Sequence, residues 1–205
     1  MASAFAVALA AAVAMLEFRG AGHEGTVLAL RLTARWSYCL FLPAYLGGAL
    51  TTLFGPVFKP LARRGRDLGL AFAAAHLVHF GLVVWLYHIS ARPPVGTSSA
   101  IYFGIALLFT YLIALFSIPS LFAKLPPRIW RLLVTVGMEY IALAFLRDFL
   151  QNPFHHGLVN LLAYLPFIAL AFTALALRLC AYAKRYVASH AGIAGGYSER
   201  SGNPR

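Results

Sequence analysis

Six apolar runs, most of them close to the length of a membrane-spanning helix, constrain this chain more than any other feature. They cover Ala2–Leu16, Trp36–Phe58, Leu68–Ile89, Ala100–Phe122, Ile129–Leu150 and Leu158–Ala183. A helix of about 20 predominantly apolar residues spans the hydrocarbon of a bilayer. Because lipid offers no hydrogen bonds to the backbone, such runs must be helical. The sequence therefore predicts an all-α integral membrane bundle of about six transmembrane helices.

The overall composition agrees with a lipid environment. Of 205 residues, 61% are hydrophobic and 11% are charged, whereas soluble domains carry about 25% charged residues. A soluble chain of this length could not hide so much apolar surface in one core. Residues 1–188 are predicted to form a single transmembrane domain. The polar, glycine-rich stretch 189–205 is predicted to be a disordered cytoplasmic tail.

The first run leaves two interpretations open. Residues 2–16 are short for a span and contain A-x-A patterns like those before a signal-peptide cleavage site. They lack the positively charged start that a signal peptide needs. A retained first helix is therefore favoured, and removal of this segment is the alternative.

Positive charge alternates between the loops and predicts the orientation. The rich segments hold Lys59, Arg63, Arg64 and Arg66, then Lys124 and Arg128, then Lys184 and Arg185. Two of the alternate loops are poorer, with Arg92 alone in one and no Lys or Arg between Gln151 and Gly157 in the other. Since basic loops stay in the cytoplasm, six helices place both termini there, in the cell (inner) membrane. The net charge of +11 then meets anionic lipid headgroups. No basic stripe interleaved with aromatic residues indicates nucleic-acid binding.

Ionisable residues within the apolar runs are the candidates for function, because lipid makes them costly. The third run carries His76 and His79 near its middle and His88 near its end. His76 and His79 share one face at a spacing of three, while His88 falls on roughly the opposite side. Neutral imidazole is a common metal ligand, and haem iron takes axial histidine. The alternative is a histidine that hydrogen-bonds a hydroxyl of a neighbouring helix.

The fifth run carries Glu139 at its centre and Arg147 two turns later. Arg147 can reach the outer membrane face with its long side chain. Glu139 cannot, so it must be protonated or paired with a His or Arg of another helix. A pair between Glu139 and His76 or His79 is our hypothesis.

Two further histidines, His155 and His156, lie in the loop after the fifth run. With His88 they could form a small metal site outside the membrane, although an ordinary polar turn is the favoured interpretation. No G-x-S-x-G or H-E-x-x-H arrangement indicates a catalytic nucleophile or zinc protease.

Several short motifs resemble the ferric reductase-like transmembrane domain. They are Thr33–Trp36, Arg63–Leu70 followed by His79, Pro127–Leu133, and Gly137–Tyr140. That family includes the quinone-linked, haem-binding membrane subunit of methionine sulfoxide reductase. The resemblance spans roughly residues 33–183 and implies that a histidine at the position of His79 ligates haem b.

The chain departs from the family in its fifth run. Val134 and Arg147 occupy the two positions where the family carries haem-ligating histidines. A haem clamped between the third and fifth helices cannot form in the family's way. Three outcomes stay open: a different partner such as His155 or His156, a five-coordinate haem, or a haem-free relative.

Three functions follow as expectations. The first is an oxidoreductase component that holds one haem b and passes electrons across the bilayer, with a partner protein or a quinone as donor. The second is a haem-free structural or assembly protein on the same fold. The third is a proton or small-solute carrier that uses Glu139 and the central histidines.

Overall fold

The computed structural model describes the backbone of residues 1–122, 125–151 and 158–200 and the side chains of residues 1–121, 125–151 and 162–190. Within these ranges the chain is helical, with six helices long and apolar enough to cross a membrane. The long helices are α1 (Ala2–Arg19), α2 (His23–Phe54), α4 (Gly65–Ile89), α5 (Thr97–Phe116), α7 (Pro127–Gln151) and α8 (Leu158–Arg200). The all-α membrane bundle predicted from the sequence is confirmed.

Short elements follow α2 and α5 at one end of the bundle. A 3₁₀ turn η1 (Pro56–Phe58) and α3 (Lys59–Arg63) join α2 to α4, and α6 (Pro119–Phe122) follows α5. We call this the arginine-rich end, because Arg63, Arg64, Arg66 and Arg128 lie there. The opposite end holds the α1–α2 turn and the α4–α5 loop.

The helix boundaries differ from the apolar runs at three places. The helix α2 begins at His23 rather than at Trp36, because Glu24, Arg31 and Arg35 lower the hydropathy without opposing helix formation. The helix α5 ends at Phe116, and Pro119 starts α6 instead of continuing the span, since proline cannot donate the backbone bond. The helix α8 continues to Arg200, so residues 189–200, expected as a disordered tail, are helical.

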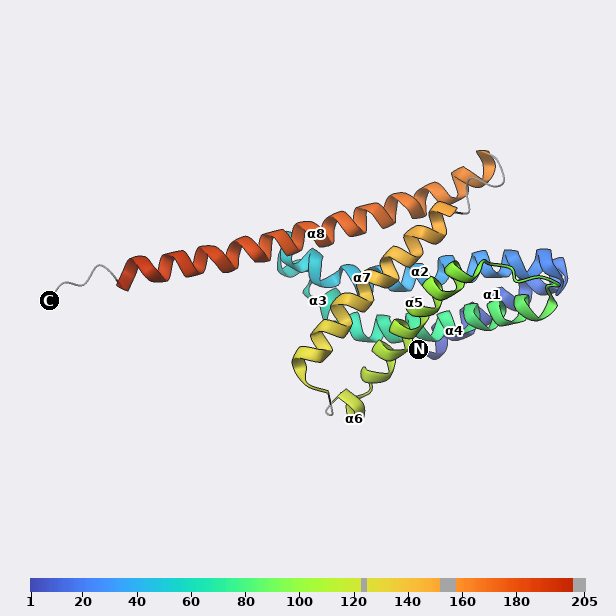
Figure 1. Ribbon diagram of the computed structural model, residues 1–205, viewed down its shortest axis with the longest axis horizontal. Helices are drawn as coiled ribbons and strands as arrows, with labels where there is room; N and C mark the ends of the chain where they lie inside the picture. The colour runs from blue at the N-terminus through green and yellow to red at the C-terminus, as the bar shows by residue number, and fades with distance from the viewer. Residues whose placement is uncertain (123–124, 152–157, 201–205) are drawn as a thin grey trace.

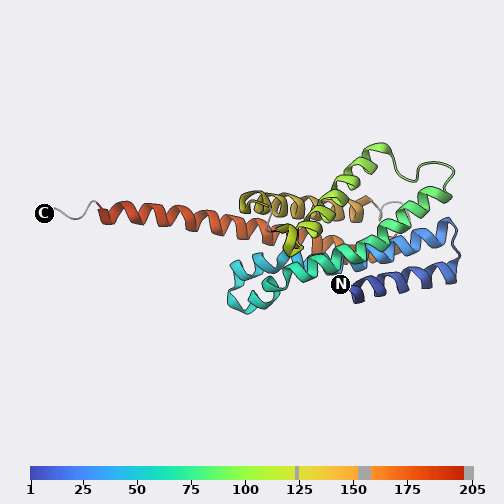
Figure 2. The ribbon, with the colours of Figure 1, turned by 90° about the horizontal axis from the view of Figure 1, so that it is seen from below.

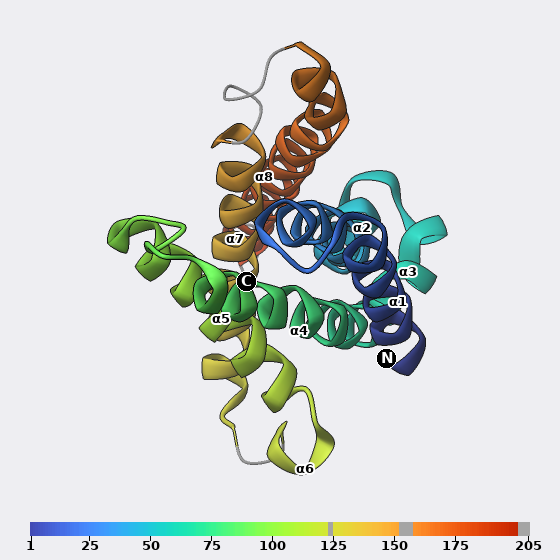
Figure 3. The ribbon, with the colours of Figure 1, turned by 90° about the vertical axis from the view of Figure 1, so that its right-hand side faces the viewer.

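The helix α2 is the central element of the bundle. It contacts α1, α4 and α8, and the end-on view shows it between α1 and α8 (Figure 3). The helix α7 crosses α8 and packs on α5, as Figure 1 shows. The helix α8 projects far beyond the other helices toward the C-terminus (Figures 1 and 2). Only part of α8 can therefore lie within the bilayer.

The helix α1 packs on α2 and α4 through a stripe of alanines. Ala4, Ala8 and Ala12 are buried against Ala29 and Ala75, and the last two are fully inaccessible. Small side chains let helix backbones approach closely, which is the usual way helices associate in lipid. The α1–α2 turn is equally close, because a Cβ at position 25 would lie 1.9 Å from the Gly20 carbonyl oxygen.

Replacing Ala8 with leucine tests this packing. Ala8 is 0% exposed, so added methylenes must displace α2 or α4 and should cost about 1–3 kcal/mol of stability. The measurement is the thermal unfolding midpoint of the purified protein in detergent. Ala10→Leu places the same side chain on the exposed face of α1 and should leave the midpoint unchanged. Equal midpoints for the two variants would contradict the packing.

Candidate haem-binding site

The two central histidines line one large cavity. It has a volume of about 620 Å³ and lies between α2, α4, α5 and α7.

 A second cavity of the bundle has a volume of about 410 Å³. We call the larger one the histidine cavity, because His76 and His79 both lie on its wall. Its size falls in the range of small-molecule and cofactor sites, about 300–1,000 Å³.

The His79 ring is held by a hydroxyl of the neighbouring helix. Its Nδ1 lies 3.1 Å from the Thr33 Oγ1 on α2, and that hydroxyl lies 2.9 Å from the Ala29 carbonyl oxygen. A threonine hydroxyl has one proton, and the bond to the Ala29 carbonyl uses it. The tautomer that fits this arrangement carries its proton on Nδ1 and donates it to Oγ1. This tautomer leaves the lone pair of Nε2 free for a ligand.

The His76 ring stacks on His79 and has an unmatched polar atom. The two ring centroids are 5.1 Å apart at an interplanar angle of 21°. The Nδ1 of His76 is buried and has no hydrogen-bond partner among the described residues. Buried polar atoms without partners are uncommon in folded proteins and mark places where a ligand or water completes the structure.

Two arginines of α2, Arg31 and Arg35, lie on the wall of the same cavity, toward the end opposite the arginine-rich one. The guanidinium of Arg35 lies over the Tyr164 ring of α8, 4.8 Å from its centroid. The Nε atoms of both arginines are buried, and neither has a partner in the described part of the chain. Asp148 of α7 lies on this wall too, so one carboxylate partly offsets two cations.

The walls between these polar groups are apolar and aromatic. They include Phe72 and Phe80 of α4, Phe103 of α5, and Phe145 and Phe149 of α7. An apolar cavity with an imidazole at its middle and cations at one end suits a flat, largely apolar molecule with acidic groups on one edge. Haem b has this chemistry, so the residues present fit the group that the family resemblance implies.

The remaining predicted residues lie away from this cavity. His88 is exposed at the end of α4 and packs on Trp85, with ring centroids 5.8 Å apart. Arg147 donates to the Ser99 hydroxyl at 3.1 Å and lies over the Tyr102 ring, so it joins α7 to α5. His155 and His156 fall outside the described residues. Within the described ranges, no three His, Cys, Asp or Glu side chains gather where they could hold a metal ion.

Glu139 is paired with an arginine, and the pairing with His76 or His79 that we hypothesised is wrong. The Nη2 and Nε of Arg178 on α8 donate to Glu139 Oε1 at 2.7 and 2.9 Å. The Tyr182 hydroxyl donates to the same oxygen, and the Tyr45 hydroxyl of α2 donates to Oε2. The hydroxyl of Thr33 holds His79 instead. We call Glu139, Arg178, Tyr45 and Tyr182 the polar clamp, because they join α2, α7 and α8.

Sequence reasoning missed most of the partners in these two sites. Arg31 and Arg35 precede the apolar run from Trp36, so they were placed outside the membrane-spanning segments. Arg178 lies inside the last apolar run, where a single charge should have marked it as the partner of Glu139. Thr33 belongs to one of the resemblance motifs, but nothing in the sequence singles out its hydroxyl as the partner of His79, because threonine is common in membrane helices.

Comparisons of this chain with family models, with curated proteins and with solved structures found no match. The likeness to the ferric reductase-like domain therefore stays a prediction made from the motifs.

The polar clamp predicts a strong energetic coupling between Glu139 and Arg178. Their side chains are only 28% and 17% exposed, so Glu139→Gln or Arg178→Met leaves the other charge unpaired and should cost about 1–3 kcal/mol. Removing both charges should cost less than the sum, with a coupling of about 0.5–3 kcal/mol. Thermal unfolding midpoints of the two single variants and the double variant in detergent measure it.

Glu17→Gln is the matched control, because it makes the same substitution as Glu139→Gln at an exposed position of α1. It should leave the midpoint unchanged. Strictly additive losses in the double variant would show that the two side chains do not depend on each other.

Proposed function

We propose that this protein is a membrane component that binds one haem b in the histidine cavity and takes part in electron transfer. The observation that carries the proposal is the Thr33–His79 contact beside a cavity of about 620 Å³. Bound haem would supply one-electron transfer. A partner protein or a quinone is the proposed source of electrons.

Different residues of the chain would hold different parts of a bound haem. His79 would offer Nε2 to the iron, and the Thr33 hydroxyl would hold the imidazole ring through Nδ1. Such outer partners are a general feature of metal-ligating histidines. Arg31 and Arg35 would offer their guanidinium groups to the carboxylates of the group. The aromatic walls exclude water from the centre of the cavity.

A haem-free structural or assembly role is the second candidate, and two residues favour it. Val134, at one of the family's histidine positions, lines the separate 410 Å³ cavity. Arg147, at the other, is bonded to Ser99. Neither residue can ligate iron from α7. A proton or solute carrier has less support, because the polar clamp already bonds both oxygens of Glu139.

Absorption spectroscopy distinguishes the first two candidates. Protein from cells supplied with a haem precursor, purified in detergent, should show a Soret band that shifts and an α band that sharpens on adding dithionite. His79→Ala should reduce both bands to background, because it removes the imidazole that would ligate the iron. His88→Ala, which removes an exposed imidazole of the same helix, should retain them.

A cavity-filling pair provides a second control. Gly104 of α5 lines the histidine cavity, and a Cβ built there meets no atom within 4 Å. Gly104→Trp should therefore exclude haem without disturbing the packing. Gly81→Trp, at an equally open position on the exposed face of α4, should not. A featureless spectrum from well-folded wild-type protein would overturn the haem proposal and favour the haem-free one.

The proposed orientation places the arginine-rich end in the cytoplasm of the cell (inner) membrane, since basic loops are retained there. Single cysteines at Val95 and at Lys59, in a background with Cys39 and Cys180 replaced, report on the two ends. A membrane-impermeant maleimide added to intact cells should label Val95→Cys and leave Lys59→Cys unlabelled until the membrane is opened. The reverse pattern would invert the proposed topology.

A further inference from the structure

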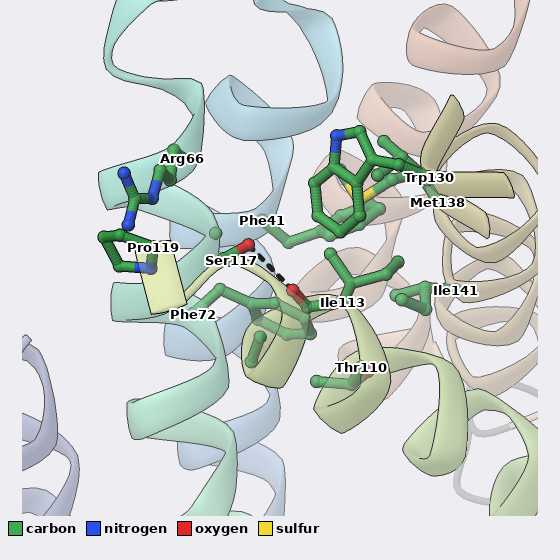
Figure 4. A pocket seen from close by; sticks show the side chains of 13 residues that line it. Phe41, Arg66, Phe72, Thr110, Ile113, Ser117, Pro119, Trp130, Met138 and Ile141 are labelled. Atoms are coloured by element: carbon green, nitrogen blue, oxygen red, sulfur yellow. Dashed lines mark hydrogen bonds between the residues drawn. The ribbon is translucent and has the colours of Figure 1, made fainter. Parts of the chain in front are cut away.

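The second cavity lies in the other half of the bundle, toward the arginine-rich end. It has a volume of about 410 Å³ and lies between α4, α5 and α7, as Figure 4 shows. Phe72, Thr110 and Ile141 line both cavities and form the wall between them. We call it the Arg66 cavity, because Arg66 is the charged residue among the described residues that line it.

The polar groups on its walls are already bonded to their own helix. The Ser117 hydroxyl donates to the Ile113 carbonyl at 2.7 Å, drawn as the dashed line in Figure 4. The Thr110 hydroxyl donates to the Ala106 carbonyl at 2.9 Å. The other walls are apolar, with Phe41, Met138 and Ile141 among them. The interior therefore suits an apolar chain rather than a polar metabolite.

The positive charge at the mouth of the cavity indicates that the polar end of a bound molecule is negatively charged. Arg66 lies in the first turn of α4 and is exposed, so its guanidinium reaches the level where lipid headgroups lie. Arg63, Arg64 and Arg128 are exposed at the same end, against one carboxylate, Asp67. Basic pockets between transmembrane helices bind the headgroups of anionic lipids.

Two residues shape the opening itself. Trp130, in the first turn of α7, lies across the cavity from Arg66 in Figure 4, and tryptophan is enriched at the membrane–water interface. Gly69, one turn into α4, leaves the space open, because a Cβ there meets no atom within 4 Å.

We propose that the Arg66 cavity binds one acyl chain of an anionic glycerophospholipid, whose phosphate pairs with Arg66. The proposal does not rest on haem, because the two residues that define the site, Arg66 and Gly69, do not line the histidine cavity. A lipid bound in this cavity differs from the surrounding lipid shell in two ways. It must carry a negative headgroup, and its binding depends on the open space beside Gly69.

Native mass spectrometry of the full chain tests the site. Delipidated protein in detergent is mixed with equal amounts of phosphatidylglycerol and phosphatidylcholine, and the retained lipid is counted. The wild type should retain one phosphatidylglycerol in preference to phosphatidylcholine. Arg66→Gln should weaken that retention about fivefold, the effect of one cation near an anionic headgroup. Gly69→Trp should abolish it by filling the cavity.

Matched controls change the same residue types elsewhere. Gly81→Trp fills an open position on the lipid-facing side of α4, and Arg92→Gln removes an exposed charge at the opposite end. Both should retain phosphatidylglycerol like the wild type. Equal retention of the two lipids, or equal losses from Arg66→Gln and Arg92→Gln, would overturn the proposal. If Gly69→Trp does not fold, the comparison of Arg66→Gln with Arg92→Gln still tests the site.

Discussion

A carboxylate within an apolar helix bundle has to meet a cation or give up its charge, and Glu139 meets Arg178. The guanidinium bonds one carboxylate oxygen with two nitrogens, and tyrosines of α2 and α8 complete the contacts. This polar clamp joins three helices at one place. In lipid, where burial of apolar surface does not drive helix association, such polar contacts and close packing decide how helices pair.

The clamp also fixes which face of α7 borders the cavities. At about 100° per residue, Ile141 and Asp148 point roughly 160–180° away from Glu139. Those two residues line the histidine cavity. With Glu139 held against α2 and α8, the opposite face of α7 is turned toward α4 and α5. Gly137 allows α5 to approach there, because a Cβ at that position would lie 2.8 Å from Ile113. The polar clamp and the histidine cavity therefore lie on opposite faces of α7.

The sequence was sufficient for the number of helices but not for their partners. Hydropathy finds apolar runs because lipid imposes a length and a composition on every span. Hydropathy missed the first turns of α2, because Glu24, Arg31 and Arg35 are polar side chains on a helical backbone. It indicated that Glu139 needs a partner, yet the choice of Arg178 over His79 depends on how α7 and α8 are rotated. Rotation is set by tertiary packing, which no periodicity within one helix contains.

The proposal that haem binds beside His79 in the histidine cavity is tested most directly by an electron cryo-microscopy map of the protein purified from haem-replete cells. The account predicts flat density between α2, α4, α5 and α7, with its strongest point next to the His79 ring and its edge near Arg31 and Arg35. A map in which the helices close over the cavity, or in which His79 faces only protein atoms, would contradict it.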